Sequence, residues 1–208
     1  MNGITAKKSG RVLLYIFLIA TGAAFLAPII IVLYNSFKGK LYISDDPFAL
    51  PNAETFSGIE NYIGGIEKTG FPSAFGWSLF ITVFSVAAIV LFASMTAWYI
   101  VRVKNKFTKA LYYIFVFSMI VPIQMVMFTM TKTVADLGLD KPWGLIIVYL
   151  GFGAGLAVFM FCGFVKSVPI EIEEAAMIDG CSPLQTFFYV VFPIMKPTAI
   201  TVAILDAM

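Results

Sequence analysis

The chain has 208 residues, of which 60% are hydrophobic and 12% charged, with a formal net charge of +2 and a mean hydropathy of +0.92. Soluble domains usually carry about 25% charged residues, so this composition excludes a soluble enzyme and indicates an integral membrane protein. The small net charge gives no indication of nucleic-acid binding, and with no histidine and only two separated cysteines the chain suggests neither a catalytic or metal site nor a disulfide framework.

The first predicted elements are an N-terminal segment, residues 1–11, and a first transmembrane helix, residues 12–36. Lys7, Lys8 and Arg11 precede the apolar run. The run is longer than the apolar core of a secretory signal and has no small-residue cleavage site after it, so we interpret it as retained. Residues 37–73 are polar and acidic and are expected to form an external loop with one short helix near residues 59–66.

Three further apolar spans are expected in residues 74–208, at residues 75–101, 111–131 and 143–165. Trp77 and Trp98 mark the two ends of the second span, as suits membrane interfaces. Pro122 predicts a kink in the third span, and the nearby Gln124 needs a polar partner or water. The fourth span contains a stripe of glycines, which favours close helix packing, with a gate or hinge as the alternative. The loop after the second span is basic and has no acid: Arg102, Lys104, Lys106 and Lys109.

Residues 167–193 are too short and too charged to cross a bilayer, and they predict two helices of about ten residues, roughly 15 Å each, joined by a sharp turn. Pro169 suits the first helical turn, and Gly180 can supply the left-handed residue that ends the helix. Ser182 with Gln185 forms a capping-box pattern, and Pro193 is expected to stop the second helix. Three acids complement the positive end of the first helix: Glu171, Glu173 and Glu174.

The last apolar run, residues 195–208, is shorter than the roughly twenty residues that a span needs, so a truncated fifth span is expected. It contains Asp206, and an unpaired charge at such depth costs about 2.5 to 3.5 kcal/mol. Asp206 and Gln124 are therefore the candidates for lining a substrate path. Helix packing for Gln124, and a hydrated chain end for Asp206, are the alternatives.

The distribution of basic residues predicts the orientation. Nine of the 14 basic residues lie in the N-terminus, in the loop after the second span, or beside the hairpin at Lys166 and Lys196. The positive-inside rule therefore places the N-terminus, this loop and the hairpin in the cytoplasm. The chain has no phosphate-binding loop of the Gly-x-x-x-x-Gly-Lys-Ser/Thr type. ATP hydrolysis is thus not expected in this chain.

The sequence Glu174-Ala175-Ala176, followed by Asp179-Gly180 and by Val190-Val191-Phe192-Pro193, resembles the Glu-Ala-Ala loop of permease subunits of bacterial ABC importers. That resemblance implies an all-α polytopic transmembrane helix bundle of the type I permease fold, with five spans of an expected six present here. It implies a multi-pass protein of the bacterial inner membrane that binds no cofactor itself. The implied partners are a second permease subunit, two ATP-binding cassette subunits that use the ATP, and an extracytoplasmic substrate-binding protein.

The segments around residues 119–124, 137–146 and 163–180 resemble the maltose-permease-like branch, which implies sugar or oligosaccharide transport. Two other classes remain open from the residues alone: a secondary transporter and a structural membrane subunit. Spans one to four contain no acid, which disfavours proton or sodium coupling. An amphipathic hairpin lying on lipid is a further alternative, although such helices usually carry lysine or arginine rather than acids.

Overall fold

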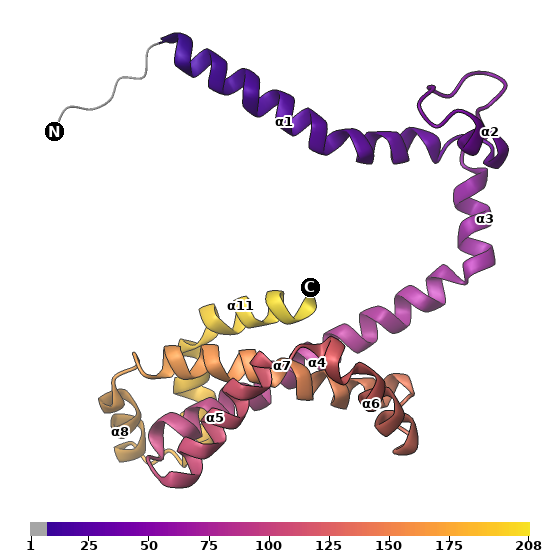
Figure 1. The fold of residues 1–208 in the computed structure, drawn as a ribbon. Helices are drawn as coiled ribbons and strands as arrows, with labels where there is room; N and C mark the ends of the chain where they lie inside the picture. The colour runs from indigo at the N-terminus through magenta and orange to yellow at the C-terminus, as the bar shows by residue number, and fades with distance from the viewer. Residues whose placement is uncertain (1–7) are drawn as a thin grey trace. The chain divides into compact units, whose positions relative to one another are not determined.

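The computed structural model describes residues 8–208, and every regular element in that range is a helix (Figure 1). The predicted all-α fold is confirmed. Of the predicted N-terminal segment, residues 1–7, including Lys7, lie outside the described residues. The chain divides into two compact units, one ending at Ala74 and the other beginning at Phe75.

The first unit contains α1 (Lys8–Asn35), α2 (Lys40–Asp45) and α3 (Glu60–Thr69). Helix α1 is the predicted first apolar helix and continues through Pro28. Helix α3 is the short helix expected in the polar loop, and it ends at Gly70, whose φ is +61°. Helix α2 was not predicted, because six residues are too few to show a helical period.

A buried lysine organises the loop of this unit. Lys38 is 1% exposed, its Nζ donates to the carbonyl of Asp46 at 2.9 Å, and it lies 5.4 Å from the centre of the Tyr34 ring. The Asn61 side chain donates to the carbonyls of Ser36 and Lys38 at 2.9 and 2.6 Å. These bonds tie the end of α1 to the loop and to α3.

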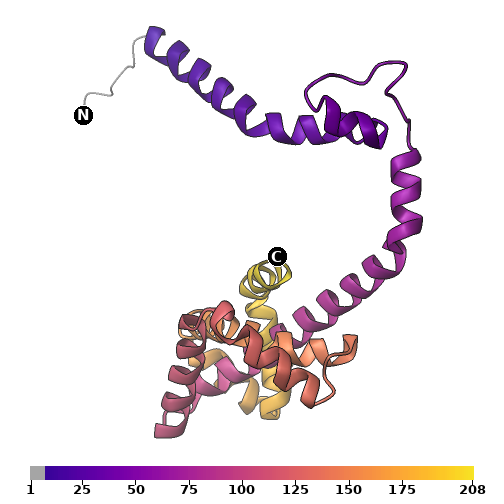
Figure 2. The same ribbon diagram turned by 45° about the vertical axis from the view of Figure 1, so that its right-hand side comes forward.

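The second unit is built on α4 (Phe71–Arg102), α5 (Lys106–Ile120), α6 (Ile123–Asp136), α7 (Pro142–Val165) and α11 (Lys196–Ala207). Helix α7 packs against both α5 and α11 (Figures 1 and 2). The core joins α4 and α7 to the segment 187–195 through small, branched and aromatic side chains, among them Ala97, Val158, Phe161 and Val191.

Helices α4 and α7 run parallel to each other. At their starts, the rings of Trp77 and Trp143 are 6.0 Å apart, and near their ends the Cys162 thiol lies 3.8 Å from the carbonyl of Ala97. Two parallel membrane helices need a return crossing between them. The α5–α6 segment is the part of the chain available for that crossing.

Within residues 8–208, three helices, α1, α4 and α7, are long and apolar enough to cross a membrane, and two bent pairs bring the number to as many as five. The predicted third span, residues 111–131, is one of these pairs: α5 ends at Ile120, α6 begins at Ile123, and the two are bent by 104°. The expectation of a mere kink was therefore wrong. Pro122 holds Val121 in an extended conformation with φ −76° and ψ 112°, which breaks the helix rather than bending it.

The glycines of α7 have different surroundings. A Cβ on Gly153 would lie 2.6 Å from the Ile89 side chain of α4, and one on Gly155 would lie 3.0 Å from the Phe115 carbonyl of α5. Gly151 has open space around it. The predicted close packing thus holds for Gly153 and Gly155 alone among these three.

Candidate functional site

The first helix of the hairpin, α8 (Ile170–Ile178), follows Pro169 and ends in a Schellman motif. Gly180 has φ +92°, its N–H donates to the Met177 carbonyl at 3.1 Å, and the Cys181 N–H donates to the Ala176 carbonyl at 3.0 Å. Both bonds satisfy carbonyls that the helix end leaves unpaired. The predicted helix-ending role of Gly180 is confirmed.

The second helix begins with the predicted capping box. The Gln185 N–H donates to the Ser182 Oγ at 3.4 Å, and the Ser182 N–H donates to the Gln185 Oε1 at 2.8 Å. The helix then runs through α9 (Pro183–Thr186), a π-helical segment, η1 (Phe187–Val191), and α10 (Phe192–Ile194).

The sequence predicts that Pro193 stops this helix, but the helix continues past it to Ile194. Pro193 occupies the first turn of α10, and the chain bends by 76° into α11 only after Ile194. A proline in a continuous α-helix would clash with the carbonyl four residues earlier. The wider π turn before it, closed by the Phe192 N–H on the Phe187 carbonyl, gives the ring room.

A buried ion pair fixes the hairpin to α4. The Glu173 side chain is 2% exposed, and its Oε1 accepts from Arg102 Nη2 at 2.7 Å and from Arg102 Nε at 2.9 Å. Its Oε2 accepts from the Trp98 indole at 2.9 Å. Arg102 also donates to the Val168 carbonyl at 3.0 Å, so one side chain holds both the approach to α8 and its first turn.

The rest of the α8 surface is open. Glu174, Ala175, Asp179 and Gly180 are exposed, and Ala176 is half-buried. Large apolar side chains are exposed beside them on both hairpin helices: Met177, Ile178, Leu184 and Tyr189, with Ile178 86% exposed. Apolar side chains at the tip of a polar hairpin mark an interaction surface rather than a packed core.

A second feature is a cavity of about 500 Å³ between α4, α7 and α11. Its apolar wall carries polar side chains from all three helices, namely Ser78, Thr82, Ser85, Tyr149 and Asp206. The Ser85 hydroxyl and the Asp206 Oδ2 are buried and have no hydrogen-bond partner within the described part of the chain. Gln124 is exposed on the first turn of α6 and lies outside this lining, although its neighbour Ile123 belongs to it.

Comparison with known proteins decides the family. The model of the family described as binding-protein-dependent transport system inner membrane component matches residues 89–208, which include the hairpin and Asp206. The chain belongs to this family. As a family member it is an α-helical membrane permease of a binding-protein-dependent importer, and the predicted resemblance is confirmed.

Two relatives of this permease are named for sugar transport. The probable starch degradation products transport system permease protein AmyC of Thermoanaerobacterium thermosulfurigenes is 38% identical over 183 residues, 88% of this chain and 66% of AmyC. The multiple sugar-binding transport system permease protein MsmG of Streptococcus mutans is 34% identical over 197 residues, 93% of this chain and 70% of MsmG. The permease chain therefore spans about two thirds of their length.

The fold is also similar to a solved structure of a bacterial ABC transporter involved in the import of the acidic polysaccharide alginate. The match has a TM-score of 0.75 at 22% identity and covers 97% of this permease chain and 71% of that chain. At this identity the likeness concerns the fold alone.

The predicted hairpin residues Glu174, Ala175, Ala176, Asp179 and Gly180 lie in the second half of α8 and the turn after it, and all but the half-buried Ala176 are exposed. Pro193 lies at the far end of the second helix. The contact of Glu173 with Arg102 and Trp98, which we call the clamp, was not predicted from the sequence. The sequence analysis assigned Glu173 only as an acid near the positive end of a helix. One signal was available: Trp98 and Arg102 are four residues apart at the end of a span, hence on one helix face, and arginine suits buried ion pairs better than lysine.

Proposed function

We propose that this permease forms half of the translocation pathway of an ATP-driven importer and is coupled through its hairpin, residues 167–193, to a separate ATPase. The observation that carries the proposal is the pairing of an exposed docking surface with a buried clamp. The surface contains Glu174, Ala175 and Gly180. The clamp consists of Glu173 of α8, whose Oε1 lies 2.7 Å from Nη2 of Arg102 in α4. A push on the hairpin would thus move α4 as a rigid body.

The cytoplasmic position of the hairpin is part of this proposal. The clamp joins α8 to the end of α4 where the basic loop begins, so the hairpin and the basic residues lie at one end of the second unit. The positive-inside rule assigns that end to the cytoplasm, where ATP is available. The partners would be a second permease, two ATPase subunits and an extracytoplasmic binding protein.

Sugars or oligosaccharides are the proposed substrates. AmyC and MsmG are named for starch products and for multiple sugars. The cavity between α4, α7 and α11 offers hydroxyl groups and the Asp206 carboxylate, which can hydrogen-bond sugar hydroxyls. Gln124 remains a weaker candidate, because it lies outside that lining.

The test is Ala175→Trp, which places a large side chain on the exposed docking surface without entering the core. We expect normal membrane insertion, loss of ATPase co-purification and loss of ATP-dependent sugar uptake in vesicles that contain the complete importer. Ala110→Trp is the matched control, because Ala110 is exposed on α5 and is not part of the hairpin. Normal coupling in Ala175→Trp would refute the docking role, and gradient-driven uptake without any ATPase would favour a secondary transporter.

A further inference from the structure

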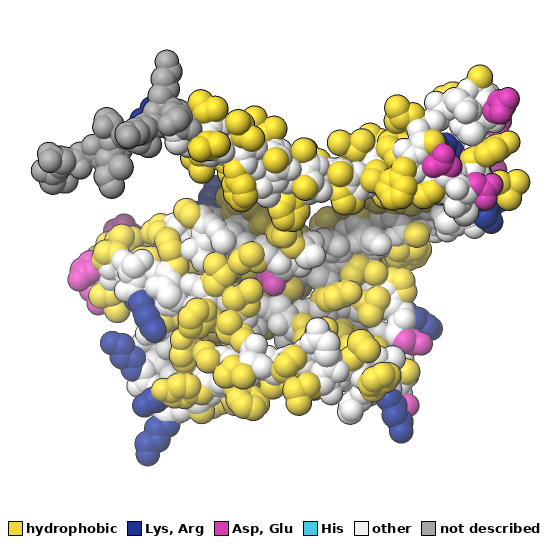
Figure 3. All heavy atoms as spheres, turned by 45° about the horizontal axis from the view of Figure 1, so that its top comes forward, with side chains coloured by type: hydrophobic (Ala, Val, Ile, Leu, Met, Phe, Trp, Pro, Cys, Tyr) yellow, Lys and Arg dark blue, Asp and Glu magenta, His cyan; other side chains and the backbone are white. Residues whose placement is uncertain are grey.

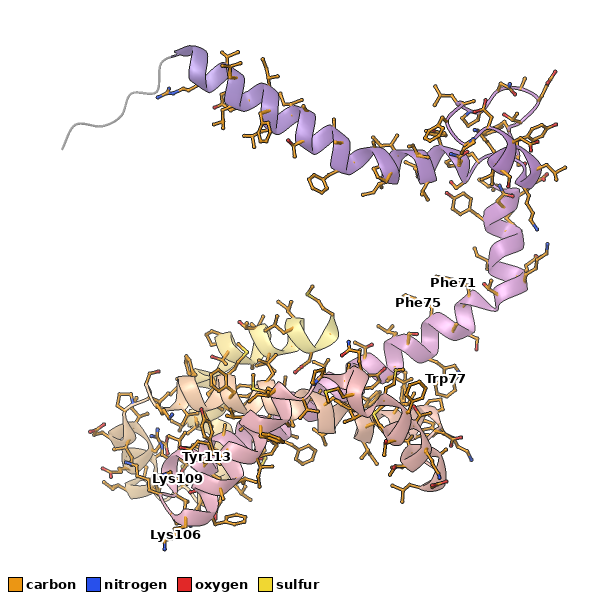
Figure 4. All side chains as sticks on the ribbon, in the orientation of Figure 1. Phe71, Phe75, Trp77, Lys106, Lys109 and Tyr113 are labelled. Carbon is orange, nitrogen blue, oxygen red and sulfur yellow. The ribbon has the colours of Figure 1, made fainter. Side chains whose placement is uncertain are left out.

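A basic cavity of about 780 Å³ opens where α4, α5 and α7 meet, at the same end of the second unit as the hairpin. Five cationic side chains line it: Arg102, Lys104, Lys106, Lys109 and Lys166. Its lining, all of it within the described range, contains no carboxylate. Figure 3 shows lysine and arginine side chains gathered at one corner of this unit, and Figure 4 shows Lys106 and Lys109 on the first turns of α5.

The charges in this cavity are only partly used. Arg102 is held by Glu173, and Lys166 Nζ lies 5.4 Å from the centre of the Tyr112 ring. Within the described residues, Lys104, Lys106 and Lys109 have no acidic partner. All three lie within seven positions of Arg102 in the sequence. Like charges that line one cavity repel one another, and an anion bound between them would reduce that repulsion.

A second hollow lies on α5, the helix that also forms part of the basic cavity. Farther along α5, an apolar groove of about 430 Å³ is lined by Tyr113, Ile114, Val116, Phe117 and Ile120. Tyr112 of the basic cavity and Val116 of the groove are one helical turn apart, so the groove begins about one turn of α5 beyond the cavity. A free phosphate or nucleotide would use the basic cavity alone, whereas a phospholipid would use both.

We propose that this cavity binds the phosphate headgroup of an anionic phospholipid whose acyl chains lie along the α5 groove. Basic pockets between membrane helices suit anionic headgroups. The volume of about 780 Å³ also falls within the range of roughly 300 to 1,000 Å³ that is typical of small-molecule sites. The Asn105 amide adds a neutral hydrogen-bonding group to the lining, whereas the Thr108 hydroxyl already donates to the Val103 carbonyl at 2.6 Å.

The test measures lipid retention by the full chain in neutral detergent, using native mass spectrometry. The probes are phosphatidylglycerol, phosphatidylcholine with the same acyl chains, glycerol 3-phosphate and inorganic phosphate. We expect retention of phosphatidylglycerol alone. The triple change Lys104→Gln, Lys106→Gln and Lys109→Gln should weaken this binding by about fivefold per lysine, on the order of 100-fold in all.

Two further variants separate the cavity from net charge and from folding. Lys68→Gln, Lys132→Gln and Lys141→Gln make the same charge change at exposed lysines outside the cavity and should leave retention unchanged. Replacing the three cavity lysines by arginine keeps the charges and should keep the lipid.

Several results would overturn the proposal. One is equal retention of the two lipids, and another is unchanged binding in the triple glutamine variant. Competition by inorganic phosphate as strong as that by the lipid would assign the cavity to a free anion. Loss of the lipid when the chain assembles with its partners would instead assign it to a protein contact.

Discussion

Removing the Glu173 carboxylate should release the hairpin from α4. Glu173 is 2% exposed and accepts three hydrogen bonds of 2.7 to 2.9 Å from Arg102 and Trp98. Removing one partner of a buried pair costs about 3 to 5 kcal/mol, because the remaining charge is left without a partner. The Arg102 side chain is 17% exposed and can take up water, so we expect the lower end, about 3 kcal/mol, for Glu173→Ala.

The assay is hydrogen exchange of the backbone amides of α8, which reports the free energy of local opening. A loss of about 3 kcal/mol corresponds to exchange that is faster on the order of 100-fold. Glu173→Gln can still accept one bond and should give a smaller increase, on the order of tenfold. The matched control is Glu171→Ala, which removes an exposed carboxylate from the same helical turn and should leave exchange nearly unchanged.

A double variant separates the pair from general loss of packing. Arg102→Met combined with Glu173→Met removes both charges and should be less destabilised than the sum of the two single variants. If Glu173→Ala and Glu171→Ala accelerated exchange equally, the clamp would not hold the hairpin and the rigid-body coupling argument would lose its basis.

Three further predictions concern other parts of the chain. Asp206→Asn should change the apparent affinity for the imported sugar while preserving assembly, and unchanged uptake kinetics would exclude Asp206 from the substrate path. Gly155→Leu should force a side chain against Ser118 and the Phe115 carbonyl and lower stability by about 1 to 3 kcal/mol in a thermal unfolding assay, whereas Gly151→Leu, in open space, should not. Lys38→Met should remove the 2.9 Å bond to the Asp46 carbonyl and make the loop 39–59 more sensitive to protease, and the exposed Lys40→Met should serve as a neutral control.

Local signals in the sequence were sufficient for the long helices and for the hairpin caps. Helices α1, α4 and α7 follow from apolar runs that are long enough to cross the hydrocarbon core of a membrane. The capping box of Ser182 and the left-handed Gly180 follow from side-chain and backbone chemistry within a few residues. The family resemblance of the hairpin motif depended on the same short stretch.

Long-range contacts required the tertiary structure. Glu173 and Glu174 are adjacent and chemically identical, yet the first is buried against Arg102, 71 positions away, and the second is exposed. Helix rotation decides which of them faces α4, and that rotation is set by packing rather than by propensity. Lys38 was similarly indistinguishable from a surface lysine until the loop folded over it.

The breaks in the membrane helices also depended on tertiary structure. Pro122 and Pro193 both predicted an interruption, but Pro122 gave a 104° bend, whereas Pro193 is accommodated after a π turn. A proline removes one hydrogen bond in either case, and the neighbouring packing decides whether the helix breaks or widens. The sequence by itself thus determined the membrane class, the long helices and the hairpin motif. Tertiary structure decided the clamp, the two cavities and the bends, because each depends on contacts between residues far apart in the chain.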